Sequence, residues 1–329
     1  MKLFFCKVDG GNFGDDMNEW FWDALFPDYR RLAPEATMFG IGSILWRDNL
    51  AGHARVVVMG SGSGYGVIPN RIPDNTGIGF VRGPRTARLL GLERDAAITD
   101  PAAMVSTLAE FQDVRSSGDV VFVPHVGTAK LPLGWGRLTA RAGVRFVSPA
   151  QDARAVIAAI AGARLVLAES LHGAIIADAF RVPWVPLAIS PTFNAHKWFD
   201  WSESLETEIG FEEFLGGLKT ARALAARLRR LGGRGTGAQE RKPRVAGTHV
   251  APAFSQDAKQ SARKWVAKLA PVVEAMLVRD LLRARKARHF LSPDTVLRQR
   301  QSQITARIAE VGDRLTAEGA RPRAIAARG

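Results

Sequence analysis

A strand-turn-helix-strand unit over residues 164–190 constrains the fold of this chain more than any other segment. Residues 165–168 are an apolar run of strand length, and residues 174–180 are small and apolar, as in a buried helix. Pro183 ends that helix before a second apolar strand over 184–189. Two strands joined through a helix form a parallel crossover, and parallel sheets are covered on both faces. The unit therefore predicts an α/β protein.

The polar side chains of this unit lie in its turn. Ser170 and His172 follow the carboxyl end of the first strand and stand at the amino end of the helix. Ligands of open parallel sheets bind at this edge, because free helix N–H groups and the helix dipole favour negative charge there. We therefore expect an anionic ligand at His172. The alternative is that Ser170 only caps the helix and that His172 is a satisfied buried histidine.

Short apolar strands followed by polar turns recur along the chain. Strands are expected at 3–8, 37–41, 55–59 and 79–82, and a second series at 120–123, 145–147 and the unit above. Two consecutive series predict two doubly wound, Rossmann-like lobes that face each other across a cleft. We place the lobes at residues 1–114 and 115–215, and a basic helical extension at 216–329.

Glycine-rich turns follow the first and third strands of the first lobe. Glycine lets the backbone approach a ligand closely, so we expect these turns to line the cleft. The residues in question are Asn12, Gly14, Asp15, Asp16, Gly60, Ser61 and Gly62. Neither turn has the dinucleotide fingerprint or the Lys-Ser/Thr of a phosphate loop. Asp15 or Asp16 can equally cap the helix that follows.

Cations also follow several predicted strands. Arg82 and Arg85 lie beside a helix start at Pro84, where the dipole disfavours positive charge. Either a bound anion or a surface ion pair would balance Arg82. His125 follows the strand at 120–123, and Lys197 follows the last strand of the second lobe.

The positive charge of the chain is concentrated in its last third. Residues 222–329 carry a net charge of +16, whereas residues 1–221 carry −3. Such a segment could contact nucleic acid, anionic lipid or an acidic partner. Within it we expect a flexible loop at 232–250, a basic amphipathic helical region at 255–291 and a last helix over 297–315.

The remaining features of composition point to the cytoplasm. Cys6 is the single cysteine, and it has no partner for a disulfide. No apolar stretch is long enough to span a bilayer, and the apolar part of the first residues is short for a secretion signal. No Cys and His spacing is typical of a metal site, so we expect no metal.

Three motifs resemble those of polysaccharide pyruvyl transferases, especially enzymes of bacterial exopolysaccharides of the succinoglycan kind. They are Asn12-Phe-Gly-Asp-Asp-Met-Asn, Arg82-Gly-Pro-Arg-Thr and Glu169-Ser-Leu-His-Gly, and the likeness covers about residues 1–205. It implies a fold like the B-type glycosyltransferases, with the acceptor on the first lobe and the donor on the second. The implied reaction moves pyruvate from phosphoenolpyruvate, a co-substrate, onto two sugar hydroxyls of an oligosaccharide as a cyclic ketal, without a further cofactor.

The resemblance also implies roles for particular residues. His172 contacts the donor phosphate and transfers a proton, and Leu171 shapes the backbone beside it. The family commonly has arginine where this chain has Ser170, so Arg85, Lys197 or His125 could supply the missing charge. Arg82 is retained as a donor contact. Histidine suits the general acid because its ordinary pKa is near neutrality, and Asp15 or Asp16 could accept the sugar proton.

Two other classes of function compete with this interpretation. A nucleotide-sugar glycosyltransferase could use the same two-lobed fold, because fold does not fix function. A non-catalytic nucleic-acid-binding protein could use the basic segment, but this segment lacks interleaved aromatic residues and a known module. We expect no nucleic acid partner. If the acceptor is lipid-linked, the charges over 279–288 would instead hold the enzyme at the anionic inner face of the membrane. The alternative is that these charges only form the solvated face of a helix.

Overall fold

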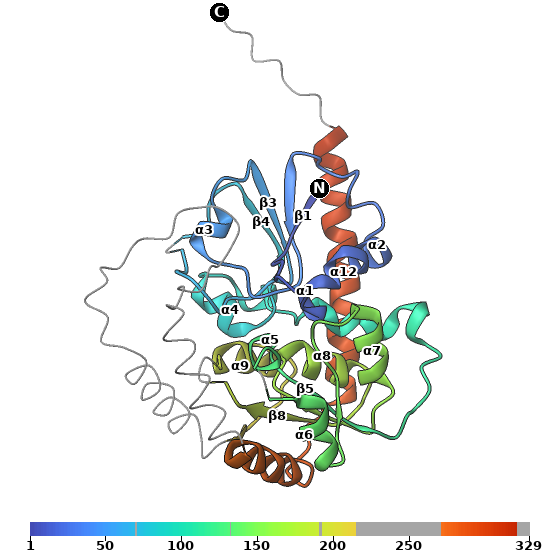
Figure 1. The fold of residues 1–329 in the computed structure, drawn as a ribbon. Coiled ribbons are helices and arrows are strands. Elements are labelled where there is room, and N and C mark those ends of the chain that lie inside the picture. The colour runs from blue at the N-terminus through green and yellow to red at the C-terminus, as the bar shows by residue number, and fades with distance from the viewer. Residues whose placement is uncertain (70, 132, 191–192, 215–270, 321–329) are drawn as a thin grey trace, which may run out of the picture.

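The structure is a computed structural model that describes residues 1–69, 71–131, 133–190, 193–214 and 271–320 (Figure 1). Within these ranges the chain forms two parallel sheets, one of four strands and one of five. Figure 1 shows the first sheet above the second, with helices around both. The predicted α/β architecture of two Rossmann-like lobes is confirmed.

The first lobe pairs its strands in their order along the chain, β1-β2-β3-β4. Its strands are β1 (Lys2–Phe4), β2 (Ala36–Phe39), β3 (Arg55–Met59) and β4 (Thr76–Phe80). Its α-helices are α1 (Phe13–Asp16), α2 (Asn18–Leu25), α3 (Arg47–Leu50) and α4 (Pro84–Leu89), and its 3-10 helices are η1 (Arg94–Ala96), η2 (Pro101–Thr107) and η3 (Ala109–Phe111). The expected strand at 79–82 begins earlier and ends at Phe80. Val81 forms an isolated bridge with Ala97, which leaves Arg82 outside the sheet.

The second lobe has the strand order β6-β5-β7-β8-β9, with every pair parallel. Its strands are β5 (Val120–Val123), β6 (Arg145–Phe146), β7 (Leu165–Ala168), β8 (Trp184–Ala188) and β9 (Glu212–Glu213). Its helices are α5 (Val126–Ala129), α6 (Trp135–Arg141), α7 (Ala153–Ala161), α8 (Leu171–Ala179) and α9 (Ala195–Ser204). β5, β7 and the crossover through α8 match the sequence prediction, because continuous apolar runs define strands that are buried on both faces.

The strand order of the second sheet locates a ligand-binding edge. The chain passes from β5 to β6 on one side and then to β7 on the other side of β5. The carboxyl ends of β5 and β7 therefore flank the point where the strand order reverses, which is where open α/β sheets bind ligands. His125 follows β5 and His172 follows β7, so the topology brings two predicted site residues to this edge.

Alternate residues of the central strands pack into different cores. In β5, Val121 and Val123 belong to a core that continues into the first lobe, whereas Val120 and Phe122 belong to a core with α6 and the helix over 271–284. This alternation is the period-2 pattern of a strand covered on both faces. The lobes therefore share apolar packing and are not joined by a linker alone.

The described part of the basic extension is helical. The helix over 271–284 packs against the second sheet through Leu277, Leu281 and Ala284. The last helix, α12 (Asp294–Ala320), includes the predicted range 297–315 and returns to pack against β4 and η2 of the first lobe (Figure 1). None of the helices in the described ranges is both long and apolar enough to cross a membrane. The expected loop at 232–250 and residues 255–270 of the amphipathic region lie outside the described residues.

Candidate active site

The carboxyl ends of β5, β7 and β8 are tied together by one buried carboxylate. Glu169 follows β7 and accepts hydrogen bonds from the backbone N–H of His125 (2.9 Å), the hydroxyl of Thr128 (2.9 Å) and the backbone N–H of Ser190 (2.8 Å). Burial raises the pKa of Glu169 to about 7, against the effect of these three bonds. The carboxylate thereby fixes the position of His125, whose Nδ1 accepts from the backbone N–H of Gly127 at 3.2 Å.

His172 stands in the first turn of α8 and is directed toward the first lobe. Ser170 caps this helix, and its hydroxyl oxygen accepts from the backbone N–H of Gly173 at 3.4 Å, while Leu171 is buried behind it. Gly14 of α1 lies against the imidazole, since a Cβ at residue 14 would be 2.1 Å from Nδ1 of His172. The predicted capping by Ser170 is confirmed, and His172 nevertheless reaches across to the other lobe.

The imidazole of His172 is not a satisfied buried histidine. Its Nε2 is buried and has no hydrogen-bond partner among the described residues. It lies 4.0 Å from Oδ2 of Asp100, which is also buried and also has no partner among these residues. Burial lowers the pKa of His172 to about 3, and the charges of Lys197 and Arg82 act in the same direction. A polar group left in this state costs stability, so it needs an explanation in function.

Lys197 of α9 is the cation at the centre of the predicted residues. Its Nζ donates to the hydroxyl of Tyr65 at 2.8 Å and lies over that ring, 4.9 Å from its centroid. The charge of this ammonium lowers the pKa values of Asp15, His125 and His172. These four side chains come from both lobes and share one electrostatic environment. We call them the Lys197 cluster.

The structure distinguishes the two candidate aspartates of α1. Asp15 accepts a hydrogen bond from the side-chain amide of Asn12, and burial raises its pKa to about 7 in spite of the Lys197 charge. Asp16 instead accepts from the backbone N–H of Asn12 at 2.7 Å and closes the first turn of its own helix. Asp15 is therefore the carboxyl group of the Lys197 cluster, whereas Asp16 bonds to Asn12, the N-cap residue of its own helix. Neither aspartate caps a helix with its side chain, so the capping considered from the sequence is wrong.

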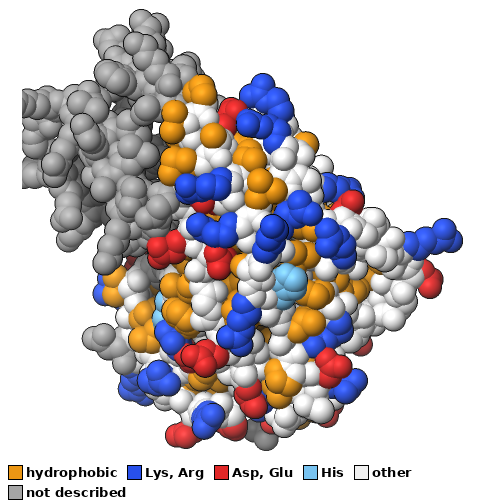
Figure 2. Space-filling model, turned by 90° about the horizontal axis from the view of Figure 1, so that it is seen from below, with side chains coloured by type: hydrophobic (Ala, Val, Ile, Leu, Met, Phe, Trp, Pro, Cys, Tyr) orange, Lys and Arg blue, Asp and Glu red, His pale blue; other side chains and the backbone are white. Residues whose placement is uncertain are grey.

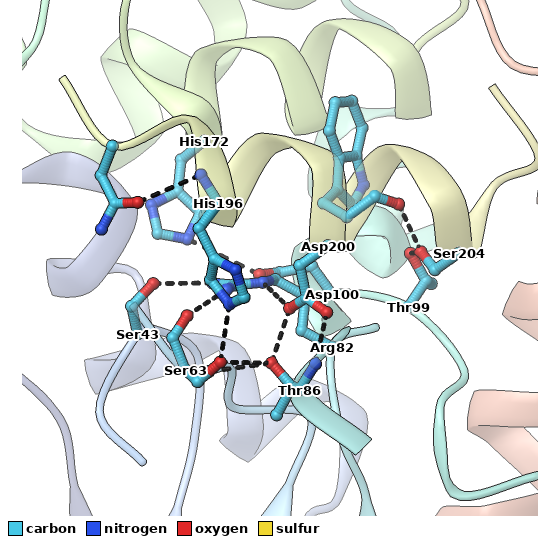
Figure 3. A network of polar contacts seen from close by, with 12 residues as sticks. Ser43, Ser63, Arg82, Thr86, Thr99, Asp100, His172, His196, Asp200 and Ser204 are labelled. Carbon is cyan, nitrogen blue, oxygen red and sulfur yellow. Dashed lines mark hydrogen bonds and ion pairs between the residues drawn. The ribbon is translucent and has the colours of Figure 1, made fainter. Parts of the chain in front are cut away.

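Arg82 is balanced by a carboxylate of the other lobe (Figure 3). Its side chain is 1% exposed, and its Nε donates to Oδ2 of Asp200 in α9 at 3.0 Å. Its two terminal nitrogens donate to the hydroxyl of Ser43 (2.7 Å) and the carbonyl of Ser63 (2.7 Å). The ion pair is thus buried and joins the two lobes, unlike the surface pair considered from the sequence. The role of Arg82 as a donor contact stays a prediction.

Asp200 also occupies the amino end of α4, where the sequence predicted an anion. Its Oδ1 accepts from the backbone N–H of Thr86 at 2.8 Å, and its Oδ2 accepts from the Thr86 hydroxyl at 2.7 Å. The Thr86 hydroxyl also meets that of Ser63 at 3.1 Å, and Ser63 meets Nε2 of His196 at 3.0 Å. We call Arg82, Ser63, Thr86 and Asp200 the Asp200 cluster.

The other residues predicted to bind substrate have structural partners. Arg85 donates to Oε1 of Glu203 (2.8 Å from Nε) and lies over the ring of Phe199. Ser61 is fully buried, and its hydroxyl donates to the carbonyl of Gly40. A Cβ at residue 60 would lie 2.2 Å from Pro101, and one at residue 62 would lie 2.2 Å from Cζ of Arg82. These glycines make room for side chains that hold the lobes together.

Sequence reasoning missed Asp100, Asp200 and Tyr65. Asp200 and Glu203 are spaced by three residues on α9, as are Arg82 and Arg85, so the matched spacing of opposite charges was the available signal. No sequence signal pointed to Asp100 or Tyr65, because each of them acts on a residue of the other lobe. Among the described residues, no three His, Cys, Asp or Glu side chains gather as a metal site would require.

Comparison with known proteins shows which proteins this chain is similar to. Residues 80–191, which include Arg82, His125 and His172, match the polysaccharide pyruvyl transferase family, so the predicted resemblance is confirmed. A named relative is the succinoglycan biosynthesis protein ExoV of Rhizobium meliloti (strain 1021), which is 42% identical over 206 residues. The alignment covers 62% of this chain and 65% of that protein, so the chain spans less than two thirds of its relative's length.

Proposed function

We propose that this protein transfers pyruvate from phosphoenolpyruvate onto two hydroxyls of a sugar in an exopolysaccharide and forms a cyclic ketal. The Lys197 cluster carries the proposal: one ammonium lies amid two histidines and a carboxyl group of perturbed pKa, at the edge where the strand order reverses. Shifted pKa values of this kind gather at sites of proton transfer. The family match over residues 80–191 supports the choice of reaction.

This chain has Ser170 at a position where the family commonly has arginine. Lys197 is the best candidate for the positive charge that this arginine would supply. Arg85 is paired with Glu203, and burial and the Lys197 charge lower the pKa of His125 to about 4, so that His125 is neutral near pH 7. Lys197 bonds only to the neutral hydroxyl of Tyr65 among the described residues. An anionic donor would gain a charge-assisted hydrogen bond there, and Tyr65 would release the ammonium.

Asp15 and His172 divide the proton transfers. The first sugar hydroxyl adds to C2 of phosphoenolpyruvate and gives its proton to Asp15, while His172 protonates the methylene carbon. The second hydroxyl then displaces phosphate and gives its proton to His172, and the departing phosphate takes the proton held by Asp15. A base with a pKa of about 7 suits this task near neutral pH. A bound donor of several negative charges would raise the pKa of His172 and favour the protonated imidazole that the first step needs.

Turnover with defined substrates tests the proposal. The protein is incubated with phosphoenolpyruvate and candidate oligosaccharides, and phosphate release is compared with the gain in acceptor mass. We expect His172→Ala to lower the rate by about 10²–10⁴-fold, whereas His289→Ala, at an exposed histidine, keeps the wild-type rate. Saturable binding of a nucleoside diphosphate without phosphoenolpyruvate turnover would favour the glycosyltransferase alternative.

We also propose that the helix over 271–284 and the residues after it contact an anionic membrane surface. The charged side chains exposed there are Arg279, Arg283, Lys286 and Arg288, and Leu282 is exposed among them at 43%. The acidic groups of this helix are covered, since Glu274 pairs with Arg137 and Arg141, and the buried Asp280 pairs with Arg279 and Arg283. Lys286 and Arg288 follow this helix on the same exposed segment. Figure 2, seen from below, shows Lys and Arg side chains on this end of the molecule, interspersed with hydrophobic side chains and with Asp and Glu.

Vesicle sedimentation tests this second proposal. We expect binding to phosphatidylserine-containing vesicles, little binding to phosphatidylcholine vesicles, and loss of binding at high salt. Lys286→Glu with Arg288→Glu should abolish sedimentation. A matched reversal of two exposed first-lobe cations, Lys2→Glu with Arg31→Glu, should keep it. Equal sedimentation of the two double variants would contradict the proposal.

A further inference from the structure

Asp100 and His172 present two buried, unpartnered atoms to each other across the interface between the lobes (Figure 3). The Asp100 side chain is 0% exposed, and its Oδ2 has no hydrogen-bond partner among the described residues. The same holds for Nε2 of His172, which lies 4.0 Å away. This separation exceeds a hydrogen bond by about 1 Å. A small relative movement of the lobes, or one bridging atom, would join the two groups.

The surroundings hold both side chains in this orientation. The other oxygen of Asp100 accepts from the backbone N–H of Ala102 at 3.0 Å and caps η2, which packs against α8. On the far side of the imidazole, Gly14 lies so close to Nδ1 that no Cβ could fit. Asp100 is therefore fixed by its own helix, and the ring of His172 is held between Asp100 and Gly14.

The two charges that act on the pKa of His172 are both positive. Lys197 of α9 and Arg82, which follows β4, both disfavour an imidazolium at this position. Asp15 of α1 is affected by the charge of Asp100, and Asp200 of α9 is engaged with Arg82. Among these groups, Asp100 is the carboxylate whose free oxygen is directed at the imidazole, and burial raises its own pKa to about 6.

We propose that Asp100 is a positioning residue for His172, which holds Nε2–H of the imidazole and supplies the counter-charge of the imidazolium. This inference rests on the proposed function. When His172 protonates the methylene carbon of the donor, the proton leaves from Nδ1, the Nε2–H stays with Asp100, and the ring becomes neutral. The ring regains its proton when the second sugar hydroxyl loses one. A carboxylate in this place fixes the tautomer and favours the protonated state, as in other acid-histidine pairs.

Substitution of Asp100 separates this role from a structural one. Asp100→Asn keeps an oxygen for the Ala102 N–H and removes the charge, and Asp100→Ser keeps a capping hydroxyl in a smaller side chain. We expect both variants to bind phosphoenolpyruvate with a Kd near that of wild type and to lower kcat by about 10²–10⁴-fold. The limb of the pH profile that reports His172 should move to lower pH, because the imidazolium loses its counter-charge. Asp95→Asn, at an exposed carboxylate of η1, is the matched control and should change neither kcat nor the profile.

Nitrogen-15 NMR of the imidazoles gives a readout that does not depend on turnover, with the His172 signal assigned through His172→Gln. We expect the Nε2–H tautomer in the wild type and a shift toward Nδ1–H in Asp100→Asn. An unchanged tautomer and unchanged kcat in a folded Asp100→Asn would overturn the inference and leave the proposed function intact. If the wild-type protein neither bound phosphoenolpyruvate nor turned it over, the proposed function and the catalytic part of the inference would both be overturned. The NMR spectra would then decide whether Asp100 holds Nε2–H of His172.

Discussion

The two polar clusters between the lobes differ in how completely their atoms are satisfied. In the Asp200 cluster, both carboxylate oxygens of Asp200 and all three guanidinium nitrogens of Arg82 have hydrogen-bond partners. Beside it, Asp100 and His172 each keep a buried atom without a partner in the described residues, and the pKa values of Asp15, Asp100 and His172 are all shifted strongly. Both clusters join the same two lobes, so their location does not explain the difference.

This difference separates structural polar groups from reactive ones. A buried polar group that is fully bonded holds the fold together, and one that lacks its bond lowers stability by about 1–3 kcal/mol. Unsatisfied groups persist where function requires them. We therefore expect substitutions in the Asp200 cluster to change stability first, and substitutions in the Lys197 cluster to change activity first.

The largest expected effect is on stability and comes from Asp200→Ala. This change leaves Arg82 buried without its counter-charge and removes the acceptor at the amino end of α4. Loss of one partner of a buried pair costs about 3–5 kcal/mol. Urea unfolding followed by circular dichroism should show a lower midpoint with the same slope.

A paired variant is the control for this prediction. Arg82→Met combined with Asp200→Leu removes both charges, so no uncompensated charge stays buried, and part of the lost stability should return. If Asp200→Ala unfolded at the same urea concentration as the wild type, the Asp200 cluster would not be what stabilises the contact between the lobes.

Asp15→Asn should act mainly on activity and its pH dependence. The pH profile of the wild-type rate is expected to have a rising limb near pH 7, because Asp15 must lose its proton to act as the base, beside the falling limb that reports His172. In Asp15→Asn this rise should be absent, and the maximal rate should fall by about 10²-fold or more. Initial rates of phosphate release from phosphoenolpyruvate across the pH range measure both effects.

The same variant should gain stability, with a defined dependence on pH. The pKa of Asp15 is higher in the folded state than its ordinary value of about 3.9. Between that value and about pH 7 the folded protein binds more protons than the unfolded one, so the wild type loses stability as the pH rises. Asp15→Asn should therefore have a higher free energy of unfolding than the wild type, and the difference should grow as the pH rises to about 7. A loss of stability would place Asp15 with the structural groups.

The sequence predicted those parts of the fold that continuous apolar runs determine. β3, β5 and β7 have the expected limits, and the crossover through α8 brings His172 to the predicted edge. Lys197 and His125 also lie where the ends of parallel strands meet. The sequence did not predict pairings across the lobes, because Arg82 and Asp200 are 118 positions apart and no local pattern connects them.

Arg82 and Arg85, which flank the start of α4, show that one physical argument can fit two different partners. The helix dipole requires negative charge near Arg82, and that charge is present, but Asp200 carries it. From the sequence alone an anion of the protein and an anion of the substrate satisfy the same rule. The three-residue spacing of Asp200 and Glu203 would have favoured the protein, since it repeats the spacing of Arg82 and Arg85.

The smallest expected effect, from Glu203→Ala, tests whether burial explains the strength of the Asp200 cluster. Arg85 of α4 pairs with Glu203 of α9, and Arg82, just before α4, pairs with Asp200 of the same helix. The side chains of the Arg85–Glu203 pair are 33% and 38% exposed, whereas those of the Arg82–Asp200 pair are 1% and 0% exposed. Water screens the exposed pair and solvates Arg85 when its partner is removed, so the loss should stay below about 1 kcal/mol. Urea unfolding of Glu203→Ala beside Asp200→Ala, at low and high salt, measures the contrast. Equal losses in the two variants would mean that the contact between α4 and α9, and not the exclusion of water from the ion pair, determines how strongly the lobes are joined.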